Sequence, residues 1–169
     1  MRTPPQRLLA GFAGTTLALV GCAWLLALTR HPWLLPSFGG SCVILFGMPR
    51  GVMAQPRSFL GGHVLATAVG LLFRWCSLRL GGPVEVWGAA AVGVALALMA
   101  LTRTIHSPAG ANPLVVFAEG ADWQFLLAPL LPGLAVLFLA AYAGNNLPRP
   151  WGAGPWPRLP TRHRGDPRG

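Results

Sequence analysis

The stretch LLAGFAGTTLALVGCAWLLAL, residues Leu8–Leu28, runs for 21 residues without a charged side chain. A helix needs about 20 predominantly apolar residues to cross a bilayer, so this stretch predicts a transmembrane helix. Three more uncharged stretches follow: Ser58–Phe73, which lengthens to about Leu78 if Arg74 reaches the interface, Val86–Thr102, and Trp123–Ala143. The sequence therefore predicts an all-α polytopic membrane protein with four firm spans.

The composition points the same way. Hydrophobic residues make up 53% of the 169 residues and charged residues only 10%, against about 25% in soluble domains. Thirteen arginines face four acidic residues, which gives a net charge of +9. So few polar residues could not cover a water-soluble surface, and no nucleic-acid-binding motif accompanies the positive charge. We therefore expect the lipid bilayer as the main partner and exclude nucleic acid.

Two further apolar segments are interrupted by proline and glycine. They are His31–Pro49 and Thr104–Ala118, and each is expected to feed a half-helix, Ser41–Met48 in the first and Asn112–Ala118 in the second. A half-helix of this length covers less than half of a bilayer. Irregular backbone at that depth is tolerated only where protein or a watery cavity satisfies its polar groups. Both segments are therefore predicted to be re-entrant or broken helices.

The two interrupted segments also suggest an internal repeat. Ser37–Phe46 aligns with Pro108–Phe117 at an offset of 71 residues, and each copy lies between two long apolar helices. The predicted fold thus has two pseudo-repeats, about 8–78 and 84–143, each with the order helix, broken segment, helix. Short, interrupted segments at matching places in two halves are typical of transport sites.

Arginine placement predicts the orientation. Arginines near the N-terminus and in the C-terminal tail favour a cytoplasmic location for both ends, in what we expect to be a bacterial inner membrane. An even number of crossings follows, and the sequence allows four or six. Residues 1–144 are expected to form the membrane domain. Residues 145–169, rich in proline and arginine, are expected to be disordered and to contact anionic lipids.

The polar residues near the breaks favour an anion path. His106 and His63 are ionisable groups at membrane depth, Arg57 precedes the third helix, and no acidic residue lies inside a predicted span. Ser41 and Asn112 are suited to cap the two half-helices, whose N-termini would then point into the membrane. Gly40 and Gly110 would let a small ligand approach the backbone. Positive charge and helix N-termini without carboxylates suit an anion.

Signs of catalysis or of a cofactor are missing from the sequence. His106 and Ser107 are adjacent, which is not the arrangement of a base and a nucleophile, and no acid is near to orient the histidine. The four histidines lack the spacing of metal ligands, and the three cysteines lie apart in apolar runs. We therefore expect neither an enzyme, nor a metal, nor a cofactor.

Two motifs resemble the HPP family of integral membrane proteins. The first is Ala54-Gln55-Pro56-Arg57-Ser58-Phe59-Leu60-Gly61-Gly62-His63, and the second is His106-Ser107-Pro108-Ala109-Gly110-Ala111. The resemblance covers about residues 8–143, and Ser107 replaces the first proline of the His-Pro-Pro motif for which the family is named. Some members are linked to nitrite transport, so the resemblance implies a small-anion transporter with nitrite as the leading substrate.

A second function class fits the same residues. In it the chain is a non-transporting membrane scaffold, the breaks serve helix packing, and the basic tail binds lipid or a partner protein. A chain this small could also need a second copy to enclose a path, so a homo-oligomer is among the expected partners. Flux of a small anion distinguishes the two classes.

Overall fold

The computed structural model describes residues 5–28, 35–146 and 156–157, and all regular structure in this part is helical. Most of the predicted tail therefore lies outside the described residues, as do residues 31–34 of the first broken segment. The α-helices are α1 (Pro5–Leu26), α2 (Pro36–Cys42), α3 (Pro56–Leu80), α4 (Val84–Leu101), α5 (Asn112–Ala118) and α6 (Leu131–Asn145). Shorter pieces are η1 (Val43–Gly47), η2 (Val52–Ala54), η3 (Ser107–Ala111) and η4 (Leu126–Leu130).

Four helices are long and apolar enough to cross a membrane. They are α1, α3, α4 and the segment formed by η4 and α6, which is kinked at Ala128, and their apolar windows match the four spans expected from the sequence. Helix α3 begins at Pro56, a residue suited to the first helical position, and ends before Gly81, whose φ of 73° only glycine adopts freely. Four predicted membrane spans are thereby confirmed.

The two broken segments contain short helices, and here the structure corrects the expected starts. The first begins at Pro36 instead of Ser41 and continues from α2 through the π-helical turn η1. Ser41 is therefore inside the helix and caps nothing. The second has the predicted range, but its capping residue is Ala111. The Asn112 side chain makes no cap hydrogen bond and points to α3 instead.

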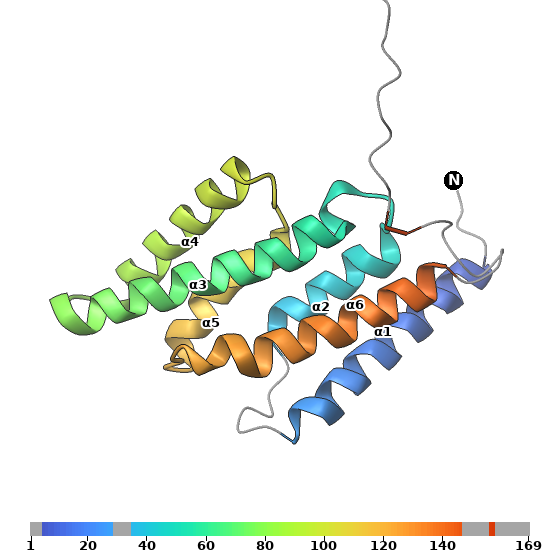
Figure 1. The fold of residues 1–169 in the computed structure, drawn as a ribbon, viewed down its shortest axis with the longest axis horizontal. Coiled ribbons are helices and arrows are strands. Elements are labelled where there is room, and N and C mark those ends of the chain that lie inside the picture. Colours follow the sequence, from blue (N-terminus) through green and yellow to red (C-terminus); the bar gives the residue numbers. More distant parts are fainter. Residues whose placement is uncertain (1–4, 29–34, 147–155, 158–169) are drawn as a thin grey trace, which may run out of the picture.

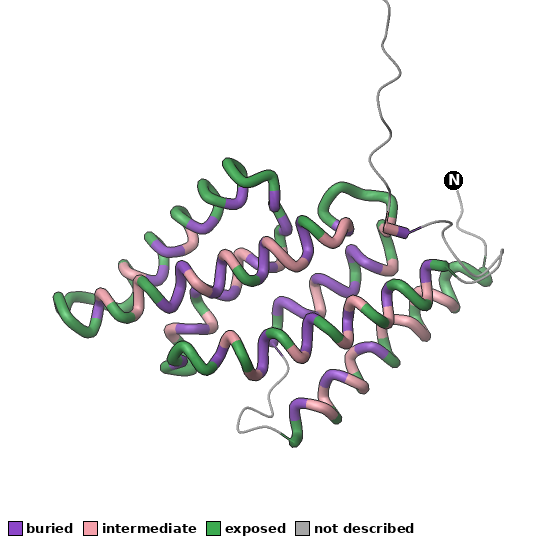
Figure 2. Tube along the Cα trace, in the orientation of Figure 1, coloured by how far each residue is buried: buried purple, intermediate pink, exposed green. Residues whose placement is uncertain are grey.

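Successive helices alternate in direction, and the two short ones lie between the long ones (Figure 1). Helix α3 packs against α4 and α5, α1 packs against α6, and α2 contacts η3. The buried fraction of the long helices differs in agreement with these contacts: 44% of the apolar window of α3 is buried, against 22% in α4 and 11% in α1 (Figure 2). Helices α1 and α4 are therefore the outer elements, and α2, α3, α5 and α6 enclose the centre.

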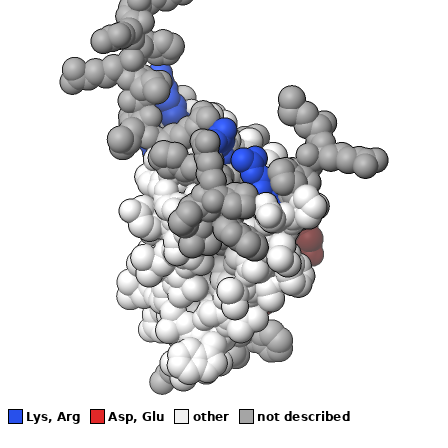
Figure 3. Space-filling model, turned by 90° about the vertical axis from the view of Figure 1, so that its right-hand side faces the viewer, with Lys and Arg blue, Asp and Glu red and all other residues white. Residues whose placement is uncertain are grey.

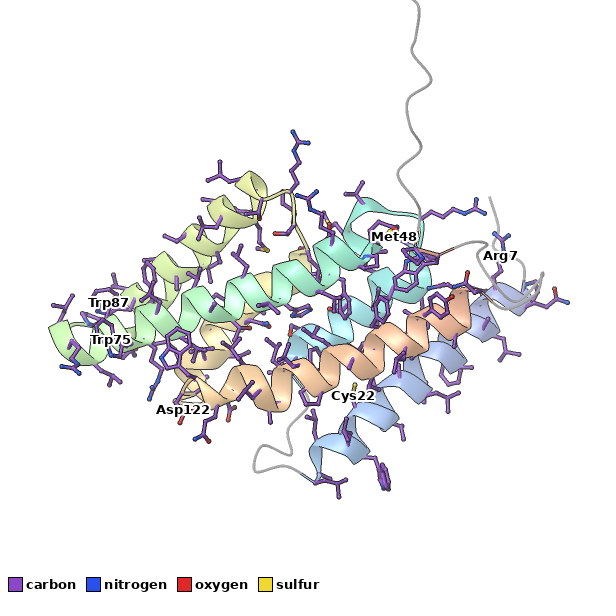
Figure 4. The ribbon with its side chains drawn as sticks, in the orientation of Figure 1. Arg7, Cys22, Met48, Trp75, Trp87 and Asp122 are labelled. Carbon is purple, nitrogen blue, oxygen red and sulfur yellow. The ribbon has the colours of Figure 1, made fainter. Side chains whose placement is uncertain are left out.

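The described charged residues are unevenly divided between the two ends of the bundle. Arg7, Arg50, Arg57 and Arg103 lie at one end, which we call the arginine end; Glu85, Glu119 and Asp122 lie at the other, the acidic end, together with Arg74 and Arg79 of α3. Arg7 and Asp122 mark the two ends in Figure 4, and Figure 3 looks onto the arginine end, where blue side chains lie along the upper part of the view. The Arg57 guanidinium donates to the Thr102 carbonyl at 2.8 Å, which joins the start of α3 to the end of α4.

The position of all three described carboxylates at one end agrees with six crossings, one of the two numbers that the sequence allows. Helices α2 and α5 each carry the chain between the two ends, although with their neighbouring turns each is only 12 residues, or about 18 Å, long. That is little more than half of the roughly 30 Å hydrocarbon core. The order of long, short and long helices occurs twice in the fold, while the repeat at the level of sequence stays a prediction.

The end of α4 turns the chain toward α3. Arg103 has a φ of 56°, and the Thr104 amide donates to the Met99 carbonyl at 2.8 Å, as in a Schellman cap. The residues that follow then run beside α3 and lead to His106. Position 103 is an arginine where glycine would be less strained.

Trp156 lies against the membrane domain. It is 3% exposed, its ring packs on Phe138, and its indole Nε1 donates to the Ala54 carbonyl at 3.2 Å. Two further hydrogen bonds with the Asn146 side chain hold the Trp156 backbone at 2.8 and 3.0 Å. This described part of the predicted tail therefore belongs to the packed core.

Candidate functional site

Two histidines and a serine meet in the centre of the bundle. His63 comes from α3, His106 precedes η3, Ser41 comes from α2, and all three are fully buried. The Ser41 Oγ lies 2.8 Å from Nε2 of each histidine, and the two ring centroids are 5.1 Å apart. The structure thus joins residues that are 22 and 65 positions apart in the chain. We call these three residues the His–Ser–His cluster.

Hydrogen bonds extend the cluster on both sides. The Asn112 amide Nδ2 lies 3.0 Å from His63 Nδ1 and donates to Thr67 Oγ1 at 2.8 Å. On the other side, His106 Nδ1 lies 2.8 Å from the Met53 carbonyl. The site therefore connects both broken segments, α3 and the loop before α3 by a continuous chain of hydrogen bonds.

The partners at each end fix the neutral tautomers. An amide Nδ2 only donates, so His63 Nδ1 accepts from Asn112 and the proton of a neutral His63 is on Nε2. A carbonyl only accepts, so His106 Nδ1 carries a proton and donates it to Met53. In the neutral state Ser41 accepts from His63 and donates to His106. All hydrogen bonds along the chain then point in one direction, from Asn112 to Met53.

Aromatic rings separate the cluster from its surroundings. The Phe59 ring lies edge-on to both imidazoles at centroid distances of 5.5 Å, and Phe38 meets His63 at 5.7 Å. Both phenylalanines are fully buried. Two apolar rings beside ionisable groups lower the local dielectric and strengthen each polar contact inside.

Glycines allow the elements to approach closely at this point. A Cβ atom on Gly62 would lie 2.8 Å from both the His106 Cβ and the Thr104 carbonyl oxygen, and one on Gly61 would lie 2.9 Å from the Thr104 side chain. A Cβ on Gly40 would lie 3.1 Å from Pro108. Gly61 and Gly62 of the first motif therefore allow α3 to pack against the extended segment that carries His106.

Only some of the residues predicted to form the site lie close together in the structure. Ser41, His63, His106 and Asn112 come together, and Gly40 lies beside Pro108. Arg57 does not reach the cluster: it is exposed at the arginine end, six residues or about 9 Å along α3 from His63. The structure therefore shows no contact between Arg57 and the His–Ser–His cluster that would support the predicted role of Arg57 in the anion path.

Other motif residues build the loop before α3. Ala54 is buried and its carbonyl accepts from Trp156, while Gln55 donates to the carbonyls of Pro49 and Gly51 at 3.1 and 3.0 Å. Pro56 opens the helix. These residues hold the Met53 carbonyl that His106 contacts. Gly110 and Ala111 lie in η3, and a Cβ on Gly110 would meet nothing within 4 Å.

Several site residues were missed by sequence reasoning. Thr67 and the Met53 carbonyl complete the hydrogen-bond chain, and Thr67 could have been found as the polar residue one turn after His63. Two buried polar atoms, Ser37 Oγ and Asn112 Oδ1, have no hydrogen-bond partner. In the described part of the chain, no three His, Cys, Asp or Glu side chains gather as metal ligands would.

A separate cavity of about 730 Å³ opens at the arginine end. It lies between α1, η1 and the end of α6, and Arg7 and Arg50 are among its lining residues. The His–Ser–His cluster does not line it. Two arginines at an opening raise the local concentration of anions through their positive potential.

Replacing Ser107 by proline, the residue that the His-Pro-Pro motif would have, is expected to leave the fold intact. Ser107 is the first residue of η3, where a missing N–H costs nothing, and His106 has the extended φ of −137° and ψ of 102° that a following proline requires. The expected change in the free energy of unfolding is within about 1 kcal/mol. Thermal unfolding of both proteins in the same detergent measures it. A drop in Tm of more than about 4 °C would contradict the assigned helix start.

Comparisons with known proteins place the chain among membrane proteins. The family model described as HPP, transmembrane region, matches residues 1–152. One transmembrane protein of Dictyostelium discoideum is 36% identical over 120 residues, covering 69% of this chain and 42% of the relative. A second from the same organism is 34% identical over 121 residues, covering 69% and 39%. The chain thus spans about two fifths of the length of these relatives. No solved structure gives a significant match.

Proposed function

Since this chain belongs to the HPP transmembrane family, we propose that it is a transporter or channel-like permease for a small inorganic anion, with nitrite as the first candidate. The observation that carries the proposal is the pair of buried imidazoles bridged by Ser41 where the two broken segments meet. Ionisable groups are costly inside a membrane domain, and short helices that meet there are typical of transport sites.

The distribution of charge favours an anion over a cation. All three described carboxylates, Glu85, Glu119 and Asp122, lie at the acidic end, whereas the cluster offers imidazole and amide groups. A cation site would need carboxylate or several carbonyl ligands. The cavity at the other end, which Arg7 and Arg50 line, also favours a negatively charged substrate.

We further propose that the arginine end faces the cytoplasm, as do both termini, because positive residues are enriched in cytoplasmic loops. Contact of the basic tail with anionic lipids and assembly into a homo-oligomer belong to this proposal, as does the absence of an enzymatic step. A bacterial cell membrane as the location stays a prediction. Reporter fusions after Arg50 and after Glu119 test the orientation: cytoplasmic signals from the first and external signals from the second are expected.

Uptake of nitrite by proteoliposomes that contain the full chain tests transport. Uptake above that of protein-free vesicles is expected, and His106→Gln should lower it at least about tenfold, because the change leaves buried partners of His106 unsatisfied. Arg79→Gln is the control, since Arg79 lies near the acidic end, over the Trp75 ring. Equal rates for wild type and His106→Gln would contradict the site. No flux of any small anion would favour the scaffold alternative.

A further inference from the structure

Ser41 has more hydrogen-bond partners than a neutral cluster can use. Its Oγ lies 2.8 Å from His63 Nε2, 2.8 Å from His106 Nε2 and 2.9 Å from the Ser37 carbonyl oxygen. A hydroxyl has one proton to donate and two lone pairs that accept. The carbonyl can only accept. All three contacts are therefore hydrogen bonds at once only when Ser41 donates to Ser37 and both Nε2 atoms carry protons.

Counting protons in that state gives one more than in the neutral cluster. His106 already carries a proton on Nδ1, where it donates to Met53, so a proton on Nε2 makes it an imidazolium. His63 stays neutral, because its Nδ1 accepts from Asn112. The positions of the heavy atoms thus fit a cluster with a single added proton.

The neutral and protonated states differ by the rotation of one hydroxyl. In the neutral state Ser41 donates to His106 Nε2, and the Ser37 carbonyl loses this donor. When a proton binds His106 Nε2, the Ser41 hydrogen turns to Ser37 and its freed lone pair accepts from His106. A second added proton is opposed by the repulsion between two imidazolium rings 5.1 Å apart. One added proton can therefore be accommodated by rotation of this hydroxyl, without movement of the backbone.

No described carboxylate faces the cluster to balance that charge. The titratable residues on the elements packed around it are Cys42 on α2, Arg57, Arg74, Cys76 and Arg79 on α3, Glu85 on α4, and Tyr142 on α6. Cys42 is an uncharged neighbour, and Glu85 is in the first turn of α4 at the acidic end. An imidazolium buried here without a counter-ion would be strongly disfavoured.

We propose that the His–Ser–His cluster takes up one proton together with the transported anion, so that the protein carries the two across the membrane as a pair. The inference rests on the proposed function and names its coupling ion. The anion supplies the missing negative charge, and its arrival favours protonation of His106 through the same electrostatic attraction. The unpartnered Asn112 Oδ1 and Ser37 Oγ add polar atoms beside the charge.

Flux under a controlled membrane potential distinguishes coupled from uncoupled transport. Proteoliposomes are loaded with a pH-sensitive dye, potassium and valinomycin set the potential, and nitrite or nitrate is added outside; protein-free vesicles correct for leakage of nitrous acid. Paired transport moves no net charge, so we expect acidification of the lumen and accumulation that is independent of potential. An uncoupled anion would change its accumulation about 50-fold per 100 mV.

Each outcome has one meaning. Potential-dependent anion uptake without acidification overturns the proton coupling and leaves the proposed transport standing. No uptake of either anion overturns the proposed function and, with it, the coupling. Ser41→Ala is expected to lower coupled uptake at least tenfold, whereas Ser41→Thr, which keeps the hydroxyl, should retain it. Ser77→Ala is the matched control, because the Ser77 hydroxyl bonds only the Arg74 carbonyl of its own helix.

Nitrogen NMR tests the cluster without any flux measurement. In full-length protein labelled with ¹⁵N-histidine and carrying His31→Asn and His163→Asn, only His63 and His106 report. At neutral pH we expect a proton on Nε2 of His63 and on Nδ1 of His106. On acidification in the presence of nitrate, His106 should become doubly protonated before His63. Opposite tautomers, protonation of His63 first, or simultaneous protonation of both rings would overturn the assignment.

Discussion

Gly62→Ala is expected to destabilise the protein and to distort the site at the same time. The added Cβ would lie 2.8 Å from the His106 Cβ and from the Thr104 carbonyl oxygen, so α3 and the chain before η3 must move apart. Overpacking of this kind costs about 1–3 kcal/mol, and the contact with backbone leaves no flexible side chain to yield. The gain of roughly 1 kcal/mol in helix propensity offsets only part of it.

The measurement is thermal unfolding in detergent, where each kcal/mol lowers Tm by about 2–4 °C in a chain of this size. Gly93→Ala is the matched control, since Gly93 also lies inside a long membrane helix and a Cβ there would meet nothing within 4 Å. It is expected to be neutral or stabilising. Equal Tm changes for the two variants would show that the close approach at Gly62 is not needed.

Trp156→Ala is expected to have the larger effect on stability. The indole is 3% exposed, packs on Phe138 and donates to the Ala54 carbonyl, so truncation removes a buried aromatic ring and a hydrogen bond together. Loss of a buried Trp typically costs about 3–5 kcal/mol. The preceding carbonyl in the chain is that of Met53, which His106 contacts, so the loss should also loosen one end of the cluster.

Trp24→Ala provides the comparison for this variant. Trp24 is 73% exposed on α1, and its truncation removes no packed contact within the bundle, so a change of less than about 1 kcal/mol is expected. Both unfolding curves are recorded in the same detergent. If the two tryptophan variants unfold at the same temperature, the tail segment does not belong to the core in solution.

The positions of the helices could be predicted from the sequence for a local reason. Apolar runs of 16 to 21 residues and proline–glycine breaks are properties of neighbouring residues, and a bilayer imposes its thickness on any such run. The four spans and the range of α5 agree with the structure. The sequence predicts the start of α2 five residues late, because Pro36 resembles a break in the apolar run although it suits a first helical position.

The site depended on contacts that no local pattern contains. The sequence identified Ser41 and Asn112 as caps, yet both side chains bond histidines from other segments. The sequence groups Arg57 with the histidines because all are polar residues near the breaks, but six residues, or about 9 Å along the axis of α3, separate Arg57 from His63. His63 and His106 come together only because the chain turns back after α3 and again after α4, and no local sequence pattern predicts both turns.

The amino-acid sequence alone thus establishes a helical membrane protein with four spans and two interruptions, and the family match confirms the resemblance. Hydrophobic length and residue type suffice for that, because each helix satisfies its own backbone within the membrane. The pairing of the buried polar groups, in contrast, depends on how the segments pack in space. Each donor in the centre must find its acceptor on another segment, and the close contacts at Gly40 and Gly62 set which segments come within hydrogen-bond distance.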